Sequence, residues 1–139
     1  MPSLFTRIIA AEIPAHVVFR AERWVAILDI KPTAPGHALL IPIAEAQHLH
    51  ELPPSTLAEL GLHLARLTRA VRQATGCPAV NVVMNDGPAA GQEVPHAHLH
   101  VIPRWPDDGL RSGPFGGSPA ATEELTAMAD RLRAAWVAA

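Results

Sequence analysis

The sequence lacks the features that mark secreted, membrane-spanning or nucleic-acid-binding proteins. Its single cysteine, Cys77, cannot form an internal disulfide, which fits a reducing cytoplasm. No apolar run approaches the ~18–20 residues needed to cross a bilayer, and the first residues, MPSLFTRIIAAEIP, have no signal-peptide pattern. The net charge is −2 and no basic tract is present, so neither nucleic acid nor a membrane surface is expected as a partner. We therefore expect a soluble cytoplasmic protein.

The chain does contain enough apolar residues to form a core of its own. It has 139 residues, of which 49% are hydrophobic. This length is typical of one compact domain, and the composition is that of a globular protein. No internal repeat is present, so we expect a single domain over residues 1–139.

The hydrophobic pattern indicates both strands and helices. Short apolar stretches bounded by turn residues predict five strands, at residues 17–20, 24–28, 37–41, 79–84 and 94–103. Residues 5–10 predict a helical turn. Leucines spaced three and four apart predict a long helix over residues 56–75, ended by Gly76 and started by a capping box of Thr56 and Glu59.

A further helix is predicted at the C-terminal end. Ser118 is placed to cap it with Pro119 at its first position, and one apolar stripe follows: Leu125, Met128, Leu132 and Trp136. The sequence therefore predicts the α+β class, with a five-stranded antiparallel sheet, one long helix and a C-terminal helix.

The most unusual stretch is HAHLH, residues 96–100. Apolar and polar residues alternate here, which predicts a half-buried strand with His96, His98 and His100 on one face. A rise of about 3.3 Å per residue separates neighbouring histidines by roughly 6–7 Å. One ligand could therefore contact all three.

Three interpretations of the histidines compete. They could form a solvated strand face. His96 and His98 could instead bind a metal, although His100 would lie roughly 13 Å from His96 and would converge less easily on one ion. The third interpretation is nucleophilic catalysis, because imidazole can attack phosphorus and form a phosphoramidate that water later opens.

The turn that precedes the histidines favours the third interpretation. In NDGPAAGQ, Gly87 and Gly91 allow the backbone to approach an anion closely, and Asn85 and Gln92 add neutral hydrogen-bond donors. The central histidine, His98, has a neighbour on each side and is the geometric choice for a nucleophile. We therefore favour nucleophilic phosphate chemistry.

The stretch AGQEVPHAHLHVIPR resembles the signature of the histidine triad (HIT) superfamily, His-φ-His-φ-His-φφ with φ apolar. The resemblance extends to FTRIIAAEIPAHVVF, to AILDIKPTAPGHALLIP and to the Asn-Asp-Gly turn, and it covers roughly residues 4–104. The chain is most similar to the histidine triad nucleotide-binding proteins and bacterial HIT hydrolases. That family acts on nucleoside 5′-phosphoramidates or on dinucleoside polyphosphates, and the resemblance implies a HIT-like fold.

The resemblance assigns a role to each matching position. It implies that His98 attacks the nucleotide α-phosphorus and forms a covalent intermediate, while His96, His100 and His37 complete a polar cluster. Asp29 would hold the ribose hydroxyls. Asn85 and Gln92 match positions that hydrogen-bond the phosphate or the scissile region. Positions that line the base pocket of the family are occupied by Phe5, Ile8, Phe19 and Ile30.

Some positions depart from the family pattern. Family members with structural zinc carry an N-terminal Cys-x-x-Cys, whereas this chain has SLFTRII, so no metal is predicted. Where relatives often place serine or threonine after the glutamine, this chain has Glu93, and its role is open. The other histidines are expected at the surface or at helix flanks: His16, His48, His50 and His63.

These features predict a nucleotide hydrolase or transferase that cleaves a purine nucleotide at the α-phosphate and releases AMP or GMP. The alternatives are a dinucleoside polyphosphate hydrolase of the diadenosine tetraphosphate type, a non-catalytic nucleotide-binding module, and a metal-dependent enzyme. No cofactor is required for the phosphoramidate route, and Mg²⁺ could accompany a polyphosphate substrate. The family commonly forms two-fold dimers. The apolar stripes of residues 57–71 and Trp136 also offer surface for a partner, so a homodimer is expected.

Overall fold

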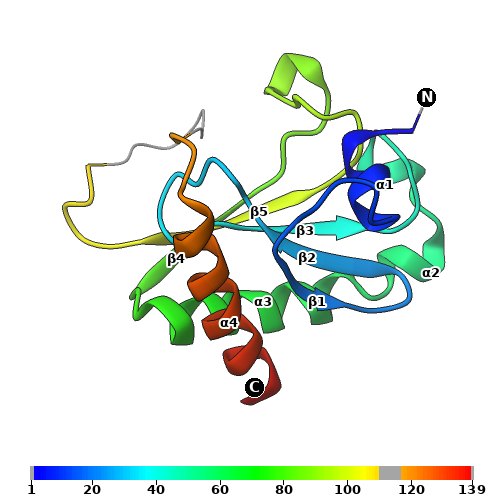
Figure 1. Cartoon of the computed structure of the whole chain (residues 1–139). Helices are drawn as coiled ribbons and strands as arrows, with labels where there is room; N and C mark the ends of the chain where they lie inside the picture. The colour runs from blue at the N-terminus through cyan, green and yellow to red at the C-terminus, as the bar shows by residue number, and fades with distance from the viewer. Residues whose placement is uncertain (1, 110–116, 139) are drawn as a thin grey trace.

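The computed structural model describes residues 2–109 and 117–138 of the chain. Its strands form one five-stranded antiparallel sheet in the order β1-β2-β3-β5-β4 (Figure 1). The strands are β1 (Val17–Arg20), β2 (Trp24–Leu28), β3 (Ala38–Pro42), β4 (Ala79–Val83) and β5 (Leu99–Arg104). The helices are α1 (Leu4–Ile9), α2 (Pro54–Leu57), α3 (Leu60–Thr75) and α4 (Thr122–Ala138), with 3₁₀ turns η1 (Leu49–Glu51) and η2 (Pro88–Ala90). The predicted α+β class and antiparallel sheet are confirmed.

The sheet separates two apolar clusters. The larger one lies between the sheet and the two long helices, α3 and α4, and its fully buried members include Trp24, Leu40, Leu67 and Leu132. The smaller cluster lies on the opposite face, where Phe5 of α1 packs against strands β2 and β3. Figure 1 shows α1 on the other side of the sheet from α3. Because α1 has only six residues, it covers only part of this face of the sheet, and the rest is open to a binding site.

The predicted long helix is divided into α2 and α3. Pro54 is the first residue of α2, and Thr56 lies inside that helix instead of capping it. The indole Nε1 of Trp24 donates to the carbonyl of Thr56 at 2.9 Å, which competes with continuation of the helical ladder. Glu59 is the N-cap of α3, so the predicted capping box is wrong. The predicted end at Gly76 is confirmed, because this residue is the C-cap and has a left-handed φ of 74°.

Helix α4 begins at Thr122, three residues after the predicted first position. Its stripe is buried as predicted, at Leu125, Met128, Leu132 and Trp136, and it packs on α3. Helices α3 and α4 cover each other's apolar stripes, so these stripes are not exposed. The expectation of a homodimer therefore cannot be based on them. In residues 2–109 and 117–138, no helix is long and apolar enough to cross a membrane.

A bulge in β1 changes the face on which Phe19 lies. The pairing register with β2 shifts between Val17 and Phe19, so these residues do not share a face as strict alternation would require. Val17 packs with the smaller cluster, whereas Phe19 packs with the larger one and stacks on Trp136 with ring centroids 4.1 Å apart. His63 is buried beside Phe19 and is not a surface residue. The bulge therefore removes Phe19 from the predicted nucleotide pocket.

Candidate active site

A cleft of about 1010 Å³ opens on the α1 side of the sheet. It is bordered by α1, by the loop that follows β2, and by the segment that connects β4 to β5. Most of the residues predicted for the site line it: Phe5, Ile8, Asp29, Ile30, Asn85, Gly91, Gln92, His98 and His100. His37, His96 and Phe19 are not among the lining residues. The cleft thus brings together side chains that lie far apart in the sequence, from Phe5 near the N-terminus to His100.

His98 enters the cleft as a neutral ring with a defined tautomer. Its Nδ1 lies 2.8 Å from the backbone carbonyl of His96, and a carbonyl only accepts, so Nδ1 carries the hydrogen. Burial lowers the pKa of His98, which keeps the ring neutral near pH 7. The lone pair is therefore on Nε2, and within the described part of the chain no hydrogen bond occupies that nitrogen. An imidazole in this state is a nucleophile without prior deprotonation.

The N-terminal helix holds the ring of His98 in place. Phe5 contacts His98 edge-on, with ring centroids 4.8 Å apart, and it is itself only 5% exposed. His100 also contacts His98, at a ring-centroid distance of 5.0 Å. The orientation of the His98 ring is therefore fixed by packing against two rings as well as by the hydrogen bond.

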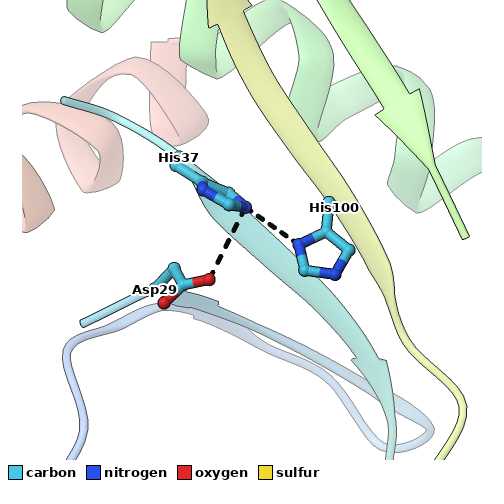
Figure 2. A group of neighbouring side chains, drawn as sticks. All are labelled: Asp29, His37 and His100. Atoms are coloured by element: carbon cyan, nitrogen blue, oxygen red, sulfur yellow. Dashed lines mark hydrogen bonds and ion pairs between the residues drawn. The ribbon is translucent and has the colours of Figure 1, made fainter. Parts of the chain in front are cut away.

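His37 and His100 form a second chain of hydrogen bonds (Figure 2). The backbone N–H of Thr33 donates to Nδ1 of His37 at 3.0 Å, so that nitrogen is an acceptor. The hydrogen of His37 is then on Nε2, from which it is donated to Nδ1 of His100 at 2.9 Å. His100 in turn carries its hydrogen on Nε2, the nitrogen left to act as a donor. Burial lowers the pKa of both histidines to about 4, so both are neutral near pH 7.

Asp29 lies beside this pair of histidines and lines the cleft. Its Oδ2 lies 3.6 Å from Nε2 of His37, and its Oδ1 accepts from the backbone N–H of Lys31 at 2.9 Å. The half-buried carboxylate therefore has one oxygen held by its own loop, and it lines the cleft where a ligand could reach it. This placement is compatible with the expected binding of ribose hydroxyls.

The hydrogen-bond directions argue against a metal in the cleft. The donor atoms of Asp29, His37 and His100 lie within 4.8 Å of one another, as a metal site would require. However, the N–H of Thr33 forces the hydrogen of His37 onto Nε2, the atom that would have to coordinate the ion. Both nitrogens of His96 are also engaged, at Pro42 and Ser3. Neither the observed cluster nor the pair of His96 and His98 is arranged as a set of ligands.

His96 is fully buried behind the cleft rather than exposed within it. Strand β5 begins at Leu99 and not at residue 94, so the predicted start of this strand is wrong and both His96 and His98 lie before it. The Nε2 of His96 donates to the carbonyl of Pro42 at 2.8 Å, and its Nδ1 lies 2.8 Å from Oγ of Ser3. With both nitrogens paired, His96 has no group free to contact a substrate.

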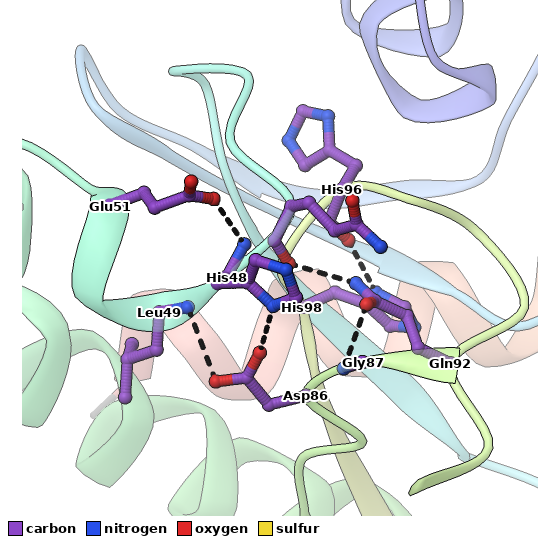
Figure 3. A network of polar contacts seen from close by, with 9 residues as sticks. His48, Leu49, Glu51, Asp86, Gly87, Gln92, His96 and His98 are labelled. Carbon is purple, nitrogen blue, oxygen red and sulfur yellow. Dashed lines mark hydrogen bonds and ion pairs between the residues drawn. The ribbon is translucent and has the colours of Figure 1, made fainter. Parts of the chain in front are cut away.

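The glycine-containing turn is fastened by Gln92 (Figure 3). The Oε1 of Gln92 accepts from the backbone N–H of Gly87, and its Nε2 donates to the carbonyl of Gln47, each at 2.9 Å. Gly91 has a φ of 98°, which favours glycine. Asn85 differs from Gln92, because no hydrogen bond found among the described residues involves its side chain. Asn85 is therefore the amide of this turn that is available to a phosphate.

Sequence reasoning missed a second anchor of the same turn. Nδ1 of His48 lies 2.7 Å from Oδ1 of Asp86, and the backbone N–H of Leu49 lies 3.4 Å from the other carboxylate oxygen. These contacts join η1 to the turn, as Figure 3 shows. Only the Asn-Asp-Gly block points to Asp86, and nothing local in the sequence marks His48, which lies 38 residues away.

Comparison with known proteins identifies the family. The HIT domain model matches residues 10–107. The chain is 34% identical over 133 residues to adenosine 5′-monophosphoramidase hnt1 of Schizosaccharomyces pombe, covering 95% of this chain and 96% of that protein. It is 36% identical over 90 residues to the asymmetrical bis(5′-nucleosyl)-tetraphosphatase of the same organism, covering 65% of this chain and 50% of that protein.

The structural comparison agrees with the sequence match. The crystal structure of hypothetical histidine triad nucleotide-binding protein ST2152 from Sulfolobus tokodaii superposes with a TM-score of 0.87 at 28% identity. The superposition covers 96% of this chain and 91% of that chain. The fold, the cleft and the match over residues 10–107 together show that this chain belongs to the histidine triad family.

Proposed function

We propose that this protein hydrolyses nucleoside 5′-phosphoramidates at the α-phosphorus and releases AMP or GMP through a nucleotide bound covalently to Nε2 of His98. The observation that carries the proposal is the lone pair on Nε2 of His98, which is fixed by the hydrogen bond from Nδ1 to the carbonyl of His96. The relative named as an adenosine 5′-monophosphoramidase, which matches nearly the whole chain, supports this substrate class.

The first step forms the covalent intermediate. The base lies against the apolar wall of Phe5, Ile8 and Ile30, and Asp29 accepts from the ribose hydroxyls. Nε2 of His98 forms a bond to phosphorus while the bond from phosphorus to the leaving nitrogen breaks. The departing amine takes a proton from water or through the histidine cluster. The Nε2–H of His100 and the amide of Asn85 donate to the phosphoryl oxygens.

The second step releases the product. A water oxygen attacks phosphorus, the bond to Nε2 of His98 breaks, and a proton of that water is released. The nucleoside monophosphate leaves, and His98 regains the lone pair on Nε2. The turn around Gly87 and Gly91 keeps its shape through both steps, because Gln92 and Asp86 hold it, and the amide of Asn85 stays within the cleft.

The charges of the cleft favour an amine as the leaving group. The charged side chains that line it are Asp29, Lys31 and Glu93, and their sum is −1. A polyphosphate leaving group would bring several further negative charges to this surface, whereas an amine brings none. The runner-up is hydrolysis of a dinucleoside polyphosphate, which the relative named as a tetraphosphatase supports. In that case Mg²⁺ would accompany the substrate and offset its charge.

A homodimer is proposed on the exposed edge of the sheet. Strand β4 is the last strand of the sheet and pairs only with β5 among the described strands, and its Val82 is 43% exposed. We expect the molar mass measured by light scattering to be twice that of the chain. Val82→Lys should give the mass of a monomer, and a monomeric parent protein would refute the proposal.

The proposed activity is tested by measuring AMP release from adenosine 5′-phosphoramidate and from diadenosine tetraphosphate, each in EDTA and with Mg²⁺. The parent protein is compared with His98→Ala and, as a matched control, with His50→Ala, whose side chain lies outside the cleft lining. We expect turnover of the phosphoramidate in EDTA, loss of activity in His98→Ala and retention in His50→Ala. Mass spectrometry of acid-sensitive adducts, quenched at neutral pH, should show one nucleotide per chain.

The outcomes separate the alternatives. Turnover of the tetraphosphate alone, once Mg²⁺ is added, would favour the runner-up. Equal activity of His98→Ala and the parent protein would show that His98 is not the nucleophile. Nucleotide binding without turnover of either substrate would favour a non-catalytic nucleotide-binding module.

A further inference from the structure

A network of four polar side chains lies directly behind His98, outside the cleft: Ser3, Thr6, Glu45 and His96. Oε1 of Glu45 accepts from the backbone N–H of Ser3 at 2.5 Å and from the hydroxyl of Thr6 at 2.7 Å. Oγ of Ser3 lies 2.8 Å from Nδ1 of His96. The network joins the start of α1, the segment after β3, and the residues just before β5. None of these side chains lines the cleft.

The direction of each hydrogen bond in the network is determined. Nε2 of His96 faces the carbonyl of Pro42, so it carries the hydrogen, and Nδ1 of the neutral ring is an acceptor. The hydroxyl of Ser3 therefore donates to Nδ1 of His96 at 2.8 Å rather than to Oγ1 of Thr6, which lies farther away at 3.2 Å and donates its own hydrogen to Glu45. The oxygen of Ser3 accepts from the backbone N–H of Thr6 at 3.0 Å. The hydrogen bonds from Ser3 and Thr6 lower the pKa of Glu45, so it accepts as a carboxylate. Each donor in the network therefore faces an acceptor.

The network ends at the atom that sets the tautomer of His98. The backbone carbonyl of His96 accepts from Nδ1 of His98 at 2.8 Å. This carbonyl precedes β5, and its peptide is held at two points: the N–H of Ala97 donates at 2.7 Å to the carbonyl of Ala46, the residue after Glu45, and the side chain of His96 is paired with Pro42 and Ser3. Phe5 lies between Ser3 and Thr6 in the chain and contacts the rings of His96 and His98 edge-on, at 5.8 and 4.8 Å.

We propose that Ser3 and Glu45 are positioning residues, which act through His96 to hold His98 with its hydrogen on Nδ1 and its lone pair on Nε2. This inference rests on the proposed function, because Nε2 of His98 is the atom to which that function assigns the attack on phosphorus. Without Ser3 or Glu45, either the ring of His96 or the segment 45–46 loses a contact that holds this peptide. The carbonyl of His96 then shifts, Nδ1 of His98 loses its acceptor, and the hydrogen of His98 distributes over both nitrogens. Molecules with the hydrogen on Nε2 cannot attack.

The decisive measurement is the tautomer of His98, read from two-bond ¹H–¹⁵N correlation spectra of protein labelled at histidine. Its signals are assigned by their loss in His98→Asn. In the parent protein we expect one tautomer, with Nδ1 protonated. Ser3→Ala and Glu45→Ala should give a mixture of both tautomers. Ser3→Thr keeps the hydroxyl and Glu45→Gln keeps an acceptor oxygen, so both should restore the single tautomer. Glu22→Ala, at an exposed position between β1 and β2, is the matched control.

Kinetics supply the second readout. In Ser3→Ala and Glu45→Ala we expect kcat to fall about 10- to 100-fold, the scale of a displaced reacting group. KM should change less than threefold, since Phe5 remains packed in the apolar cluster and keeps its wall of the cleft. The conservative variants and Glu22→Ala should retain kcat within about twofold. A role confined to stability would lower the melting temperature but leave the tautomer and kcat of the folded protein unchanged.

The possible results are distinguishable. A single Nδ1-protonated tautomer in Ser3→Ala and Glu45→Ala, with the kcat of the parent protein, would overturn the inference. An Nε2-protonated tautomer in the parent protein would overturn it together with the proposed role of His98. If the parent protein hydrolyses neither nucleotide substrate, the proposed function fails. The tautomer of His98 in the variants then still decides whether the network positions this ring.

Discussion

The Nε2 atom of His37 lies 2.9 Å from the Nδ1 atom of His100, and the backbone N–H of Thr33 determines the direction of this hydrogen bond. Consequently His100 keeps its hydrogen on Nε2, whereas His98, bonded to the carbonyl of His96, keeps its hydrogen on Nδ1. Two adjacent histidines of one cleft therefore have opposite tautomers. One offers a lone pair to phosphorus, and the other offers a donor to the charge that develops on its oxygens.

Removal of the donor at His37 should impair catalysis by releasing His100. In His37→Leu the buried Nδ1 of His100 loses its partner, a loss of about 1–3 kcal/mol for a buried polar group. We expect kcat/KM to fall roughly 10- to 100-fold, in line with that energy. His37→Gln can still donate through its amide and should recover part of the activity. Steady-state kinetics of both variants test this, and equal losses in both would contradict the hydrogen-bond direction.

The buried histidines should make the protein less stable in acid. The pKa of His37 and of His100 is lowered to about 4 in the folded protein, from an ordinary value of 6.5. Between these values the unfolded chain binds protons that the folded chain does not. The stabilising effect of the neutral rings is therefore complete above pH 6.5 and is lost as the pH falls towards 4.

Urea unfolding at several pH values tests this expectation. The free energy of unfolding should decrease by up to about 1.4 kcal/mol per pH unit for each of the two histidines. His37→Gln should show a shallower slope over the same range, because it removes one of the titrating groups. A free energy of unfolding that stays constant between pH 6.5 and 4 would show that the folded state tolerates both charged rings.

Asp29→Asn should weaken nucleotide binding at the ribose. Replacement of the carboxylate removes the charge that accepts from the hydroxyls, so we expect KM to rise about tenfold, the effect of roughly 1.4 kcal/mol. For the parent protein, a substrate that lacks both ribose hydroxyls should show a similar loss. The variant and the altered substrate combined should lose no more than either alone. Additive losses would place Asp29 away from the ribose.

Glu93→Gln should change the preference between leaving groups. Glu93 is exposed and lines the cleft, so its removal lowers the negative charge that a polyphosphate meets. We expect kcat/KM for diadenosine tetraphosphate to rise about two- to fivefold, which is the scale of an exposed charge interaction, while turnover of the phosphoramidate stays unchanged. The effect should fade in high salt. Glu123→Gln, in α4 and outside the cleft lining, serves as the control.

Two glycines should respond to alanine in opposite directions. Gly36 precedes His37 with a φ of 100°, and an added Cβ would lie 2.5 Å from Cγ2 of Thr75. Gly36→Ala should therefore destabilise the protein by about 1–3 kcal/mol. Gly61 lies in α3, where an added Cβ meets nothing within 4 Å, and Gly61→Ala should stabilise by roughly 0.5–1 kcal/mol. Urea unfolding curves of both variants provide the check.

The sequence by itself determined the class of the fold and most of the lining of the cleft. Strands β1 and β2 match their predicted bounds because each is a short apolar run between turn residues, a purely local signal. The short sequence blocks shared with the family also identified Asp29, Asn85 and His98, which line the cleft. Each block is again a local pattern. The start of α3 was less predictable, because the indole of Trp24, distant in the sequence, competes for a carbonyl of α2.

Only the tertiary structure decided which nitrogen of each histidine is free. The alternation in HAHLH predicted that His96 and His98 share a strand face on which one ligand could contact both. In the structure, both nitrogens of His96 are instead hydrogen-bonded, to Ser3 and to Pro42. A hydrogen-bond direction depends on the group that faces the ring, and these groups come from distant parts of the chain. Ser3 is 93 residues from His96, and His37 is 63 residues from His100. They meet only when α1 packs on the sheet and β3 pairs with β5, so no local pattern encodes the tautomers on which the proposed chemistry depends.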